Sequence, residues 1–406
     1  MTPVRNAFAM LRGFIAMLLV AASPTAAAAG ERAFEAALSD FRQLHRAEMR
    51  RSGIVGSSFY FVRDGRVVAA DHLGEQDAEA HVPVDARTIY HWASITKTMT
   101  GIAIMQLRDR GLLALDDPIV RYVPELARVH NPFGDTGAIT LRQLMSHSAG
   151  FRGGTWPWRD QEWQPFEPGG WAQLEAMLPY TQVQFRPGSR FSYSNPGIVY
   201  LGQVIERLTG EDFEVYVDKN ILRPLGMHAS YFDRTPPHLL RHRSHSYYIR
   251  DGRRVAAPFD VDTGVTVSNG GLNAPMTDMA KYVAFLIGDP ARSADYDLVL
   301  RRSSLEEMWR PQIAAGDDFT QGRMARTTQS GLSLFVDEGG PVRFIGHNGD
   351  QNGFRVYLSL CPDQRAGSLL AFNTETRGVR NDASNRTTAE SRIALATDHL
   401  CEALVR

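Results

Sequence analysis

Ser94 and Lys97 are the two residues whose types and spacing most directly suggest chemistry. Side chains three positions apart in a helix share one face. Apolar residues at helical spacing follow Ser94 as far as Leu107, and Gly111 ends the predicted helix. A lysine one turn from a serine can accept or orient its hydroxyl proton, and the helix N-terminus offers N–H groups to a developing anion. The pair is therefore typical of a nucleophilic serine.

The alternative is a capping serine followed by a solvated lysine, because this spacing also arises by chance. Composition favours the chemical interpretation. Of the 44 basic residues, only Lys97, Lys219 and Lys281 are lysines. An amine, unlike a guanidinium, can lose its proton at accessible pH. A lysine inside an apolar helix of an arginine-rich chain therefore indicates a role for its amine.

Tyr193 and Asn195 form a second candidate group, in a predicted loop between Pro187-Gly188 and a helix. Two residues that are two positions apart on an extended segment point to the same side, so both can face one cleft. A tyrosine beside an ammonium can have its pKa lowered enough to act as a general base. The asparagine amide can hold a substrate carbonyl or orient the lysine. The alternative is a polar turn with a packed tyrosine.

His347 is the third candidate. Residues 343–350 read as the end of a strand that passes into a turn, and Gly346 and Gly349 flank the histidine closely. Glycines at such positions let a ligand backbone approach the strand edge. A structural histidine in a glycine turn is the alternative.

The elements that position these groups come from three parts of the chain. A helix is predicted over residues 32–49, a hairpin over 57–70 around Asp64-Gly65, and short helices over 139–146, 197–209, 213–222 and 277–286. Strands are predicted over residues 331–336, 343–346, 354–360 and 368–372, before a last helix near the C-terminus. The expected fold is α/β, an antiparallel sheet with helices on both faces, divided into a sheet domain (30–115 and 322–406) and a mainly helical lobe (116–321).

Residues 1–29 have the pattern of a cleaved secretory signal peptide. Arg5 and Arg12 precede an apolar run over residues 14–22. Small residues follow this run and lead to a cleavage site near Ala28 or Ala29. No later stretch approaches the ~20 apolar residues of a membrane-spanning helix. We therefore expect a secreted or periplasmic protein with no spanning segment after signal removal.

The composition limits the classes of partner and ligand that we expect the protein to bind. The formal net charge is -1 and no basic run is present, so nucleic acid is not expected as a partner. His238, His242 and His245 lack carboxylate or cysteine partners, so neither a metal nor a cofactor is expected. Cys361 and Cys401 can pair or remain isolated thiols. Four tryptophans lie close together in the sequence and either line an apolar substrate pocket or pack a long loop: Trp156, Trp158, Trp163 and Trp171.

Taken together and in this order, the three segments resemble those of the penicillin-recognising serine hydrolases, which include class C β-lactamases, exported D,D-peptidases and related esterases. Further matching segments are residues 144–151, 224–227, 270–272, 277–278 and 346–349. The resemblance implies the fold given above and catalysis through an acyl-enzyme.

The resemblance also implies residue roles. Ser94 would be the acylated nucleophile, Lys97 its proton partner, Tyr193 the base and leaving-group acid, and Asn195 a contact of substrate and lysine. His347 and Gly349 match the third motif of the family. The backbone N–H groups of Ser94 and Asp350 would form the oxyanion hole.

Two departures from the family pattern bear on the substrate. His347 stands where the β-lactamases carry a lysine, and an imidazole with a pKa near ~6.5 is mostly neutral at pH 7. Asp350 stands where a small residue is usual, and its charge would oppose an oxyanion unless it points away or pairs with an arginine.

The sequence therefore predicts an exported serine hydrolase acting on a small-molecule or peptide ester or amide, of the esterase or D-amino-acid peptidase type. The alternatives are a D,D-carboxypeptidase or β-lactamase and, from another class, a penicillin-binding sensor that does not hydrolyse its ligand. The oligomeric state is left open.

Overall fold

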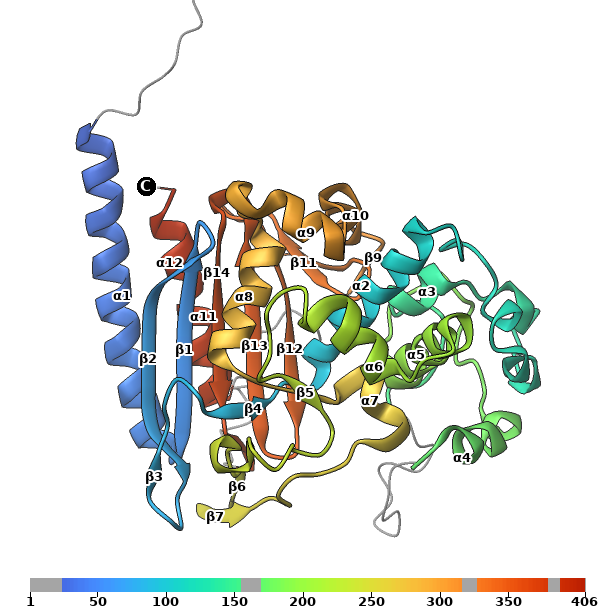
Figure 1. The fold of residues 1–406 in the computed structure, drawn as a ribbon, viewed down its shortest axis with the longest axis horizontal. Coiled ribbons are helices and arrows are strands. Elements are labelled where there is room, and N and C mark those ends of the chain that lie inside the picture. The colour runs from blue at the N-terminus through green and yellow to red at the C-terminus, as the bar shows by residue number, and fades with distance from the viewer. Residues whose placement is uncertain (1–23, 155–168, 316–326, 379–387, 406) are drawn as a thin grey trace, which may run out of the picture.

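A nine-stranded antiparallel sheet forms the centre of the molecule in this computed structural model, which describes residues 24–154, 169–315, 327–378 and 388–405 (Figure 1). The strand order is β3-β2-β1-β14-β13-β12-β11-β10-β9. These strands are β1 (Gly56–Arg63), β2 (Arg66–Asp77), β3 (Val82–Pro83), β9 (Ile313–Ala314), β10 (Thr327–Ser330), β11 (Phe335–Glu338), β12 (Phe344–Gln351), β13 (Phe354–Cys361) and β14 (Ala366–Phe372).

The other described strands form two small sheets of three strands each. One has the order β4-β8-β5 and the other β15-β6-β7. Their strands are β4 (Ile89–His91), β5 (Tyr231–Phe232), β6 (Tyr247–Arg250), β7 (Arg253–Ala256), β8 (Leu272–Pro275) and β15 (Thr374–Gly378).

Helices cover both faces of the large sheet, as predicted for the α/β fold (Figure 1). The remaining helices lie together on one side of the sheet (Figure 1). The helices are α1 (Pro24–Ser52), α2 (Thr96–Asp109), α3 (Leu141–Met145), α4 (Trp171–Ala176), α5 (Asn195–Thr209), α6 (Phe213–Val217), α7 (Val267–Gly270), α8 (Met276–Ile287), α9 (Ser293–Val299), α10 (Arg302–Met308), α11 (Ala389–Ala396) and α12 (Asp398–Ala403). None of the described helices is long and apolar enough to cross a membrane.

The alternation of side chains along β1 divides the core into two layers. Phe59 and Phe61 point to the layer that α1, α11 and α12 cover, whereas Tyr60 and Val62 point to the layer that contains α2 and α8. Both layers are buried, so β1 reads as a continuous apolar run rather than an alternating one.

The hairpin of β1 and β2 is confirmed, because Asp64 and Gly65 both have positive φ, at 50° and 74°, as a tight hairpin turn requires. The N-terminal helix is longer than the predicted 32–49. Phe34, Leu38 and Phe41 are buried along one face of this helix, whereas Leu44 is exposed.

Two predicted boundaries at the C-terminal part of the sheet were wrong. Residues 331–334 connect β10 to β11 rather than forming a strand. Residues 347–351, expected to form a turn, continue β12. The predicted boundary between the lobe and the second sheet segment falls outside the described residues, and α8, which we assigned to the lobe, packs against β1 and β14.

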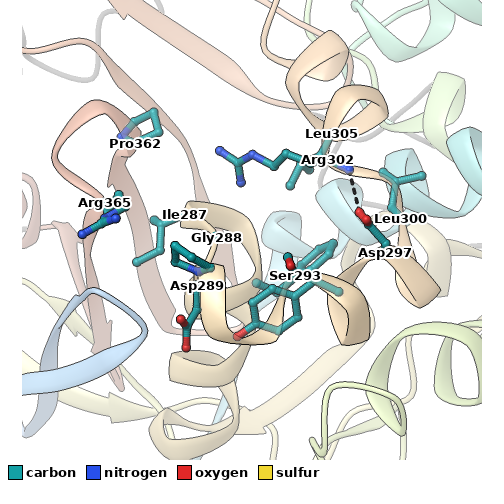
Figure 2. A pocket seen from close by; sticks show the side chains of 13 residues that line it. Ile287, Gly288, Asp289, Ser293, Asp297, Leu300, Arg302, Leu305, Pro362 and Arg365 are labelled. Atoms are coloured by element: carbon teal, nitrogen blue, oxygen red, sulfur yellow. Dashed lines mark hydrogen bonds between the residues drawn. The ribbon is translucent and has the colours of Figure 1, made fainter. Parts of the chain in front are cut away.

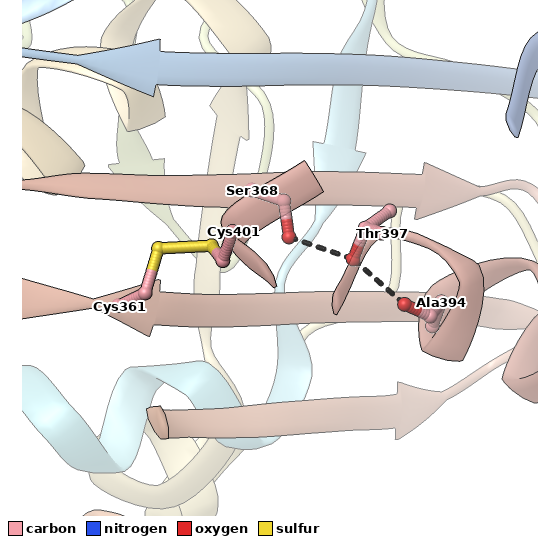
Figure 3. Close-up of a disulfide and its surroundings, with 5 residues drawn as sticks. All are labelled: Cys361, Ser368, Ala394, Thr397 and Cys401. Carbon is pink, nitrogen blue, oxygen red and sulfur yellow. Dashed lines mark hydrogen bonds between the residues drawn. A yellow bond between two sulfur atoms is a disulfide. The ribbon is translucent and has the colours of Figure 1, made fainter. Parts of the chain in front are cut away.

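Cys361 at the end of β13 and Cys401 in α12 form a disulfide (Figure 3). Beside it, the hydroxyl groups of Ser368 and Thr397 lie 2.9 Å apart, and Thr397 Oγ1 donates to the Ala394 carbonyl. The disulfide and these bonds attach the last helices to the back of the sheet.

Candidate active site

Ser94 lies where the chain turns sharply from β4 into α2. The turn is a single 3₁₀ turn, Ala93–Ile95. Ala93 has a φ of 44°, which is uncommon for a residue other than glycine and marks a constrained backbone. Trp92, fully buried, holds this turn through hydrogen bonds from its backbone N–H to Leu272 O and from its indole N–H to Ala274 O. Ser94 is left partly exposed among buried neighbours.

Lys97 is buried beside Ser94, one turn into α2. Its Nζ donates to Ser94 Oγ at 2.9 Å and to the backbone carbonyl of Asn269, in α7, at 2.8 Å. The Tyr193 ring lies beside the same Nζ, with 5.1 Å between the nitrogen and the ring centroid. The structure thus brings the first and second predicted segments together. Sequence reasoning missed Asn269 because a backbone carbonyl leaves no side-chain signal.

Tyr193 lies in the irregular segment just before α5. Its ring packs on three other aromatic rings: His147 at 4.4 Å between centroids, His347 at 6.1 Å and Phe335 at 6.5 Å. The third predicted segment therefore reaches the same place, because His347 belongs to β12.

Asn195 is the first residue of α5, and its backbone N–H donates to the Gly153 carbonyl at 3.1 Å. Its side-chain Oδ1 is buried and accepts no hydrogen bond among the described residues, so it does not accept from Lys97. The carbonyl of Asn269 accepts from the lysine instead. A role for Asn195 as a substrate contact stays a prediction.

Gly349 is where β12 comes closest to the turn that carries Ser94. A Cβ at this position would lie 2.5 Å from Trp92 O and 3.1 Å from the Ala93 Cβ, so only glycine fits without a shift. The side chain of His347 is two residues away and therefore points to the same face of the strand. β11 pairs with β12 only up to Gly346, so residues 347–351 pair with β13 alone in the described sheet.

Asp350 points to the opposite face of the sheet from Gly349, by the alternation of the strand. Its carboxylate accepts from Arg355 Nη1 at 2.8 Å. Arg355 is buried and also donates to the Tyr357 hydroxyl. The condition stated from the sequence, that this acid must point away or pair with an arginine, is met.

His347 and His147 are both buried and both neutral at pH 7. Burial and the nearby charge of Lys97 lower the pKa of His347 to about 3. Burial, Lys97 and His347 lower the pKa of His147 well below its ordinary value. His347 Nδ1 lies 2.6 Å from the Asn348 carbonyl, so this nitrogen carries the proton. His147 Nδ1 accepts from the Ser194 N–H, so its proton is on Nε2.

Trp171 packs against Tyr200 in α5, with the Arg207 guanidinium 5.7 Å from its ring. For this ring the structure favours packing of the loop onto the helices. Trp156, Trp158 and Trp163 lie outside the described residues.

The family model named beta-lactamase matches residues 41–392 of the chain, which includes all three segments. The chain belongs to the beta-lactamase family. Solved structures that share its fold include a class C β-lactamase and a D-stereospecific amidohydrolase. The resemblance inferred from the sequence is therefore confirmed at the level of family and fold.

Three relatives illustrate the range of this beta-lactamase family. The chain is 22% identical over 332 residues to protein flp of Staphylococcus aureus, which covers 82% of this chain and 62% of that protein. The octameric penicillin-binding protein homologue from Pyrococcus abyssi has a TM-score of 0.71 and 27% identity, covering 84% of this chain and 74% of that one. A D-stereospecific amidohydrolase from Streptomyces sp. has a TM-score of 0.64 and 24% identity, covering 90% and 97%, and shows the fold alone. The chain thus spans less than two thirds of the length of its staphylococcal relatives.

A separate cavity of about 330 Å³ lies at the end of α8, where α9, α10 and the turn between β13 and β14 meet (Figure 2). Arg302 lines it, and its backbone N–H donates to Asp297. No lining residue comes from the three segments of the candidate site.

Proposed function

We propose that this beta-lactamase-family chain is an exported hydrolase that forms an acyl-enzyme on Ser94 from an ester or amide substrate. The observation that carries the proposal is the hydrogen bond from the buried Lys97 Nζ to the partly exposed Ser94 Oγ, with the Tyr193 ring beside the same amine. A serine activated by a neighbouring base is the usual arrangement for nucleophilic catalysis.

In the proposed acylation, Ser94 Oγ attacks the substrate carbonyl carbon and loses its proton to the Lys97 and Tyr193 pair. The N–H groups of Ser94 and Asp350 hold the oxyanion of the tetrahedral intermediate. The bond to the leaving group then breaks, and the leaving alcohol or amine takes the proton from Tyr193. An ester on Ser94 remains.

Deacylation repeats these steps with water as the nucleophile. Water gives one proton to Tyr193 and its oxygen to the acyl carbon, and Ser94 Oγ leaves and regains the proton. The products are a free acid and the regenerated enzyme, so one water is consumed in each cycle.

The charge around β12 supports an uncharged leaving group. His347 occupies the place of the β-lactamase lysine and is neutral at pH 7, since its pKa is lowered to about 3. A substrate carboxylate would therefore meet no fixed positive charge from this residue. We accordingly favour esters and D-amino-acid amides over D-alanyl-D-alanine peptides and β-lactams.

A penicillin-binding sensor is the candidate from another class, and binding alone would not need the arrangement of Lys97 against both Ser94 and Tyr193. Export is proposed from the signal-like residues 1–29, and the Cys361–Cys401 disulfide supports it, since disulfides persist in oxidising compartments.

The test is release of p-nitrophenol from a short-chain p-nitrophenyl ester by the wild-type protein and by Ser94→Ala. We expect steady turnover by the wild type and a loss of at least about 10³-fold in the variant, because the nucleophile is removed. Mass spectrometry of the quenched wild-type reaction should show one acyl group on Ser94.

Equal rates in the two proteins would refute the assignment of Ser94. An acyl group that forms on Ser94 but is not released would favour the sensor. A parallel comparison with D-alanine p-nitroanilide, a D-alanyl-D-alanine peptide and a chromogenic cephalosporin then separates the substrate classes.

A further inference from the structure

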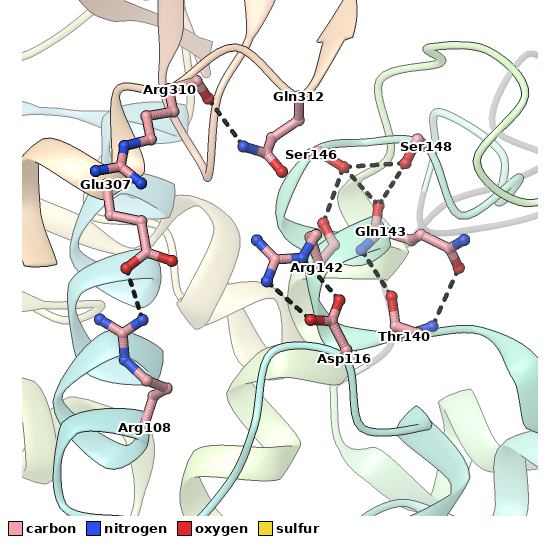
Figure 4. Close-up of polar contacts among 10 residues, drawn as sticks. All are labelled: Arg108, Asp116, Thr140, Arg142, Gln143, Ser146, Ser148, Glu307, Arg310 and Gln312. Atoms are coloured by element: carbon pink, nitrogen blue, oxygen red, sulfur yellow. Dashed lines mark hydrogen bonds and ion pairs between the residues drawn. The ribbon is translucent and has the colours of Figure 1, made fainter.

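Several hydrogen bonds hold the turn from Ser146 to Ser148, which carries His147; Figure 4 shows those of the two serines. The Thr140 and Gln143 side chains form a capping box at the start of α3. After α3 the Ser146 and Ser148 hydroxyl groups lie 3.0 Å apart (Figure 4). The Ser148 N–H also donates to the Gln143 carbonyl at 2.8 Å. His147, between these serines, has a φ of 55°, a conformation that costs energy in a residue other than glycine. The surrounding bonds hold it there.

From this turn His147 contacts the chain on both sides of Tyr193. Its backbone carbonyl accepts from the Ser192 N–H at 2.8 Å, and its side-chain Nδ1 accepts from the Ser194 N–H at 3.2 Å. The imidazole also packs on the Tyr193 ring, at 4.4 Å and 34° between planes. Three contacts thus fix the residue before the tyrosine, the residue after it and the phenol ring itself.

Tyr193 needs such support, because residues 191–194 belong to no helix or strand. The Phe335 ring packs near both rings, with its centroid 6.5 Å from that of His147 and 6.5 Å from that of Tyr193. On the side of α5, the Gly197 N–H donates to Ser194 Oγ at 3.1 Å, so the helix holds only the residue after the tyrosine through this bond. His147 contacts the residues on both sides of the tyrosine and the ring itself.

We propose that His147 is the positioning residue for Tyr193, acting through its Nδ1 acceptor and its ring and touching neither substrate nor Ser94. The inference rests on the proposed function, in which Tyr193 moves the proton in both half-reactions.

The role requires an unprotonated Nδ1 at working pH. The charged or titratable groups around the imidazole are Lys97, His347 and Tyr193. Burial and Lys97 keep the pKa of His147 low, so the lone pair on Nδ1 stays available to the Ser194 N–H.

Two variants separate the acceptor from the ring. His147→Asn places Oδ1 where Nδ1 was, and asparagine tolerates positive φ, so the bond from Ser194 is kept. His147→Phe keeps a ring and loses the acceptor. With the p-nitrophenyl ester we expect His147→Phe to lower kcat about 10²-fold, because a shift of about 1 Å costs this much. His147→Asn should stay within about tenfold of wild type, and KM should change less than about threefold in both, since Tyr193 acts in both half-reactions.

Thermal unfolding of each variant checks the fold before the rates are compared. Wild-type kcat in folded His147→Phe would overturn the proposal, and so would an equal loss in both variants, because the acceptor would then be irrelevant.

If His147→Phe does not fold, ¹⁵N NMR of the wild-type histidines tests the proposal, with the His147 signal assigned by its absence in His147→Asn. We expect a neutral Nε2–H tautomer at pH 7. An Nδ1–H or charged ring would overturn the proposal. A wild type with no Ser94-dependent turnover refutes the proposed function instead, and the NMR result still tests the contact.

Discussion

His347 and Asp350 set the charge near Ser94 from opposite faces of β12. His347 is buried on the side of Tyr193 and is neutral, and Asp350 is neutralised by Arg355 on the far side. The leaving-group side of the proposed cleft thus receives no net charge from either residue. Charge at position 347 should therefore decide which substrates the enzyme accepts.

His347→Lys tests this directly. The lysine ammonium adds a positive charge where the β-lactamases carry one, so we expect kcat/KM to rise by about tenfold or more for a substrate with a carboxylate beside the scissile bond. Turnover of the neutral p-nitrophenyl ester should not rise.

The measurement is kcat/KM on a pair of esters that differ only in one carboxylate, with His347→Gln as the uncharged control. If the ratio of the kcat/KM values for the two esters is unchanged in His347→Lys, the residue at position 347 does not discriminate between substrates by charge.

At the scale of elements, the close approach of β12 to the turn before α2 places the two proposed oxyanion N–H groups. Gly349→Ala would put a Cβ 2.5 Å from Trp92 O, whereas a carbon and a carbonyl oxygen normally keep about 3.3 Å or more. The strand and the turn must then separate by nearly 1 Å, and we expect kcat/KM for the ester to fall about 10²-fold.

Asn348→Ala is the matched control, because the side chain of this neighbour points to the other face of β12. The control should stay within about threefold of wild type. Full activity in a folded Gly349→Ala would mean that β12 does not contribute to the oxyanion hole.

Sequence patterns predicted the elements whose signals are local. The helix after Ser94 followed from its apolar spacing, and the hairpin at Asp64-Gly65 from a turn that needs two positive φ angles. The segment around His347 was misassigned as a turn, because its glycines resemble turn residues. Gly349 instead makes room for the Trp92 carbonyl, a contact between distant parts of the chain that no local pattern encodes.

The same contrast between local patterns and contacts of distant segments holds for the candidate site. Ser94, Lys97, Tyr193 and His347 could be found from residue type and order, and the structure brings them together. The Asn269 carbonyl that accepts from Lys97 could not be predicted, because every residue has a carbonyl. The contact of His147 with Ser194 could not be predicted either, because it joins two loops that are distant in sequence.

For the whole molecule, buried histidines make stability depend on pH. Burial lowers the pKa of His45 and His91 to about 4 and that of His347 to about 3, and lowers that of His147 strongly. The unfolded chain therefore binds more protons than the native state below pH 6.5, and stability falls as pH drops from 6.5 towards 4. Each histidine that stays neutral contributes up to about 1.4 kcal/mol per pH unit.

Asp233, Glu206 and Glu375 act in the opposite sense, since burial raises the pKa of each, that of Asp233 to about 6. His72 and His242, whose pKa values are lowered by burial, add to the effect of the four histidines. Urea unfolding should show a clear loss of stability between pH 7 and pH 5 and little change between pH 7 and pH 8. A midpoint that is the same at pH 5 and pH 7 would contradict these assignments.

The pairing of β1 with β14 has a consequence for how the protein is made. Ser57 pairs with Phe372, so two neighbouring strands at the middle of the sheet come from almost opposite ends of the described chain. Contacts so distant in sequence close slowly, because a long loop must be ordered first. During synthesis β1 therefore has no β14 to pair with until the chain as far as Phe372 has left the ribosome. A nascent chain that stays unfolded this long can still pass through a translocation channel, as the export that we propose would require.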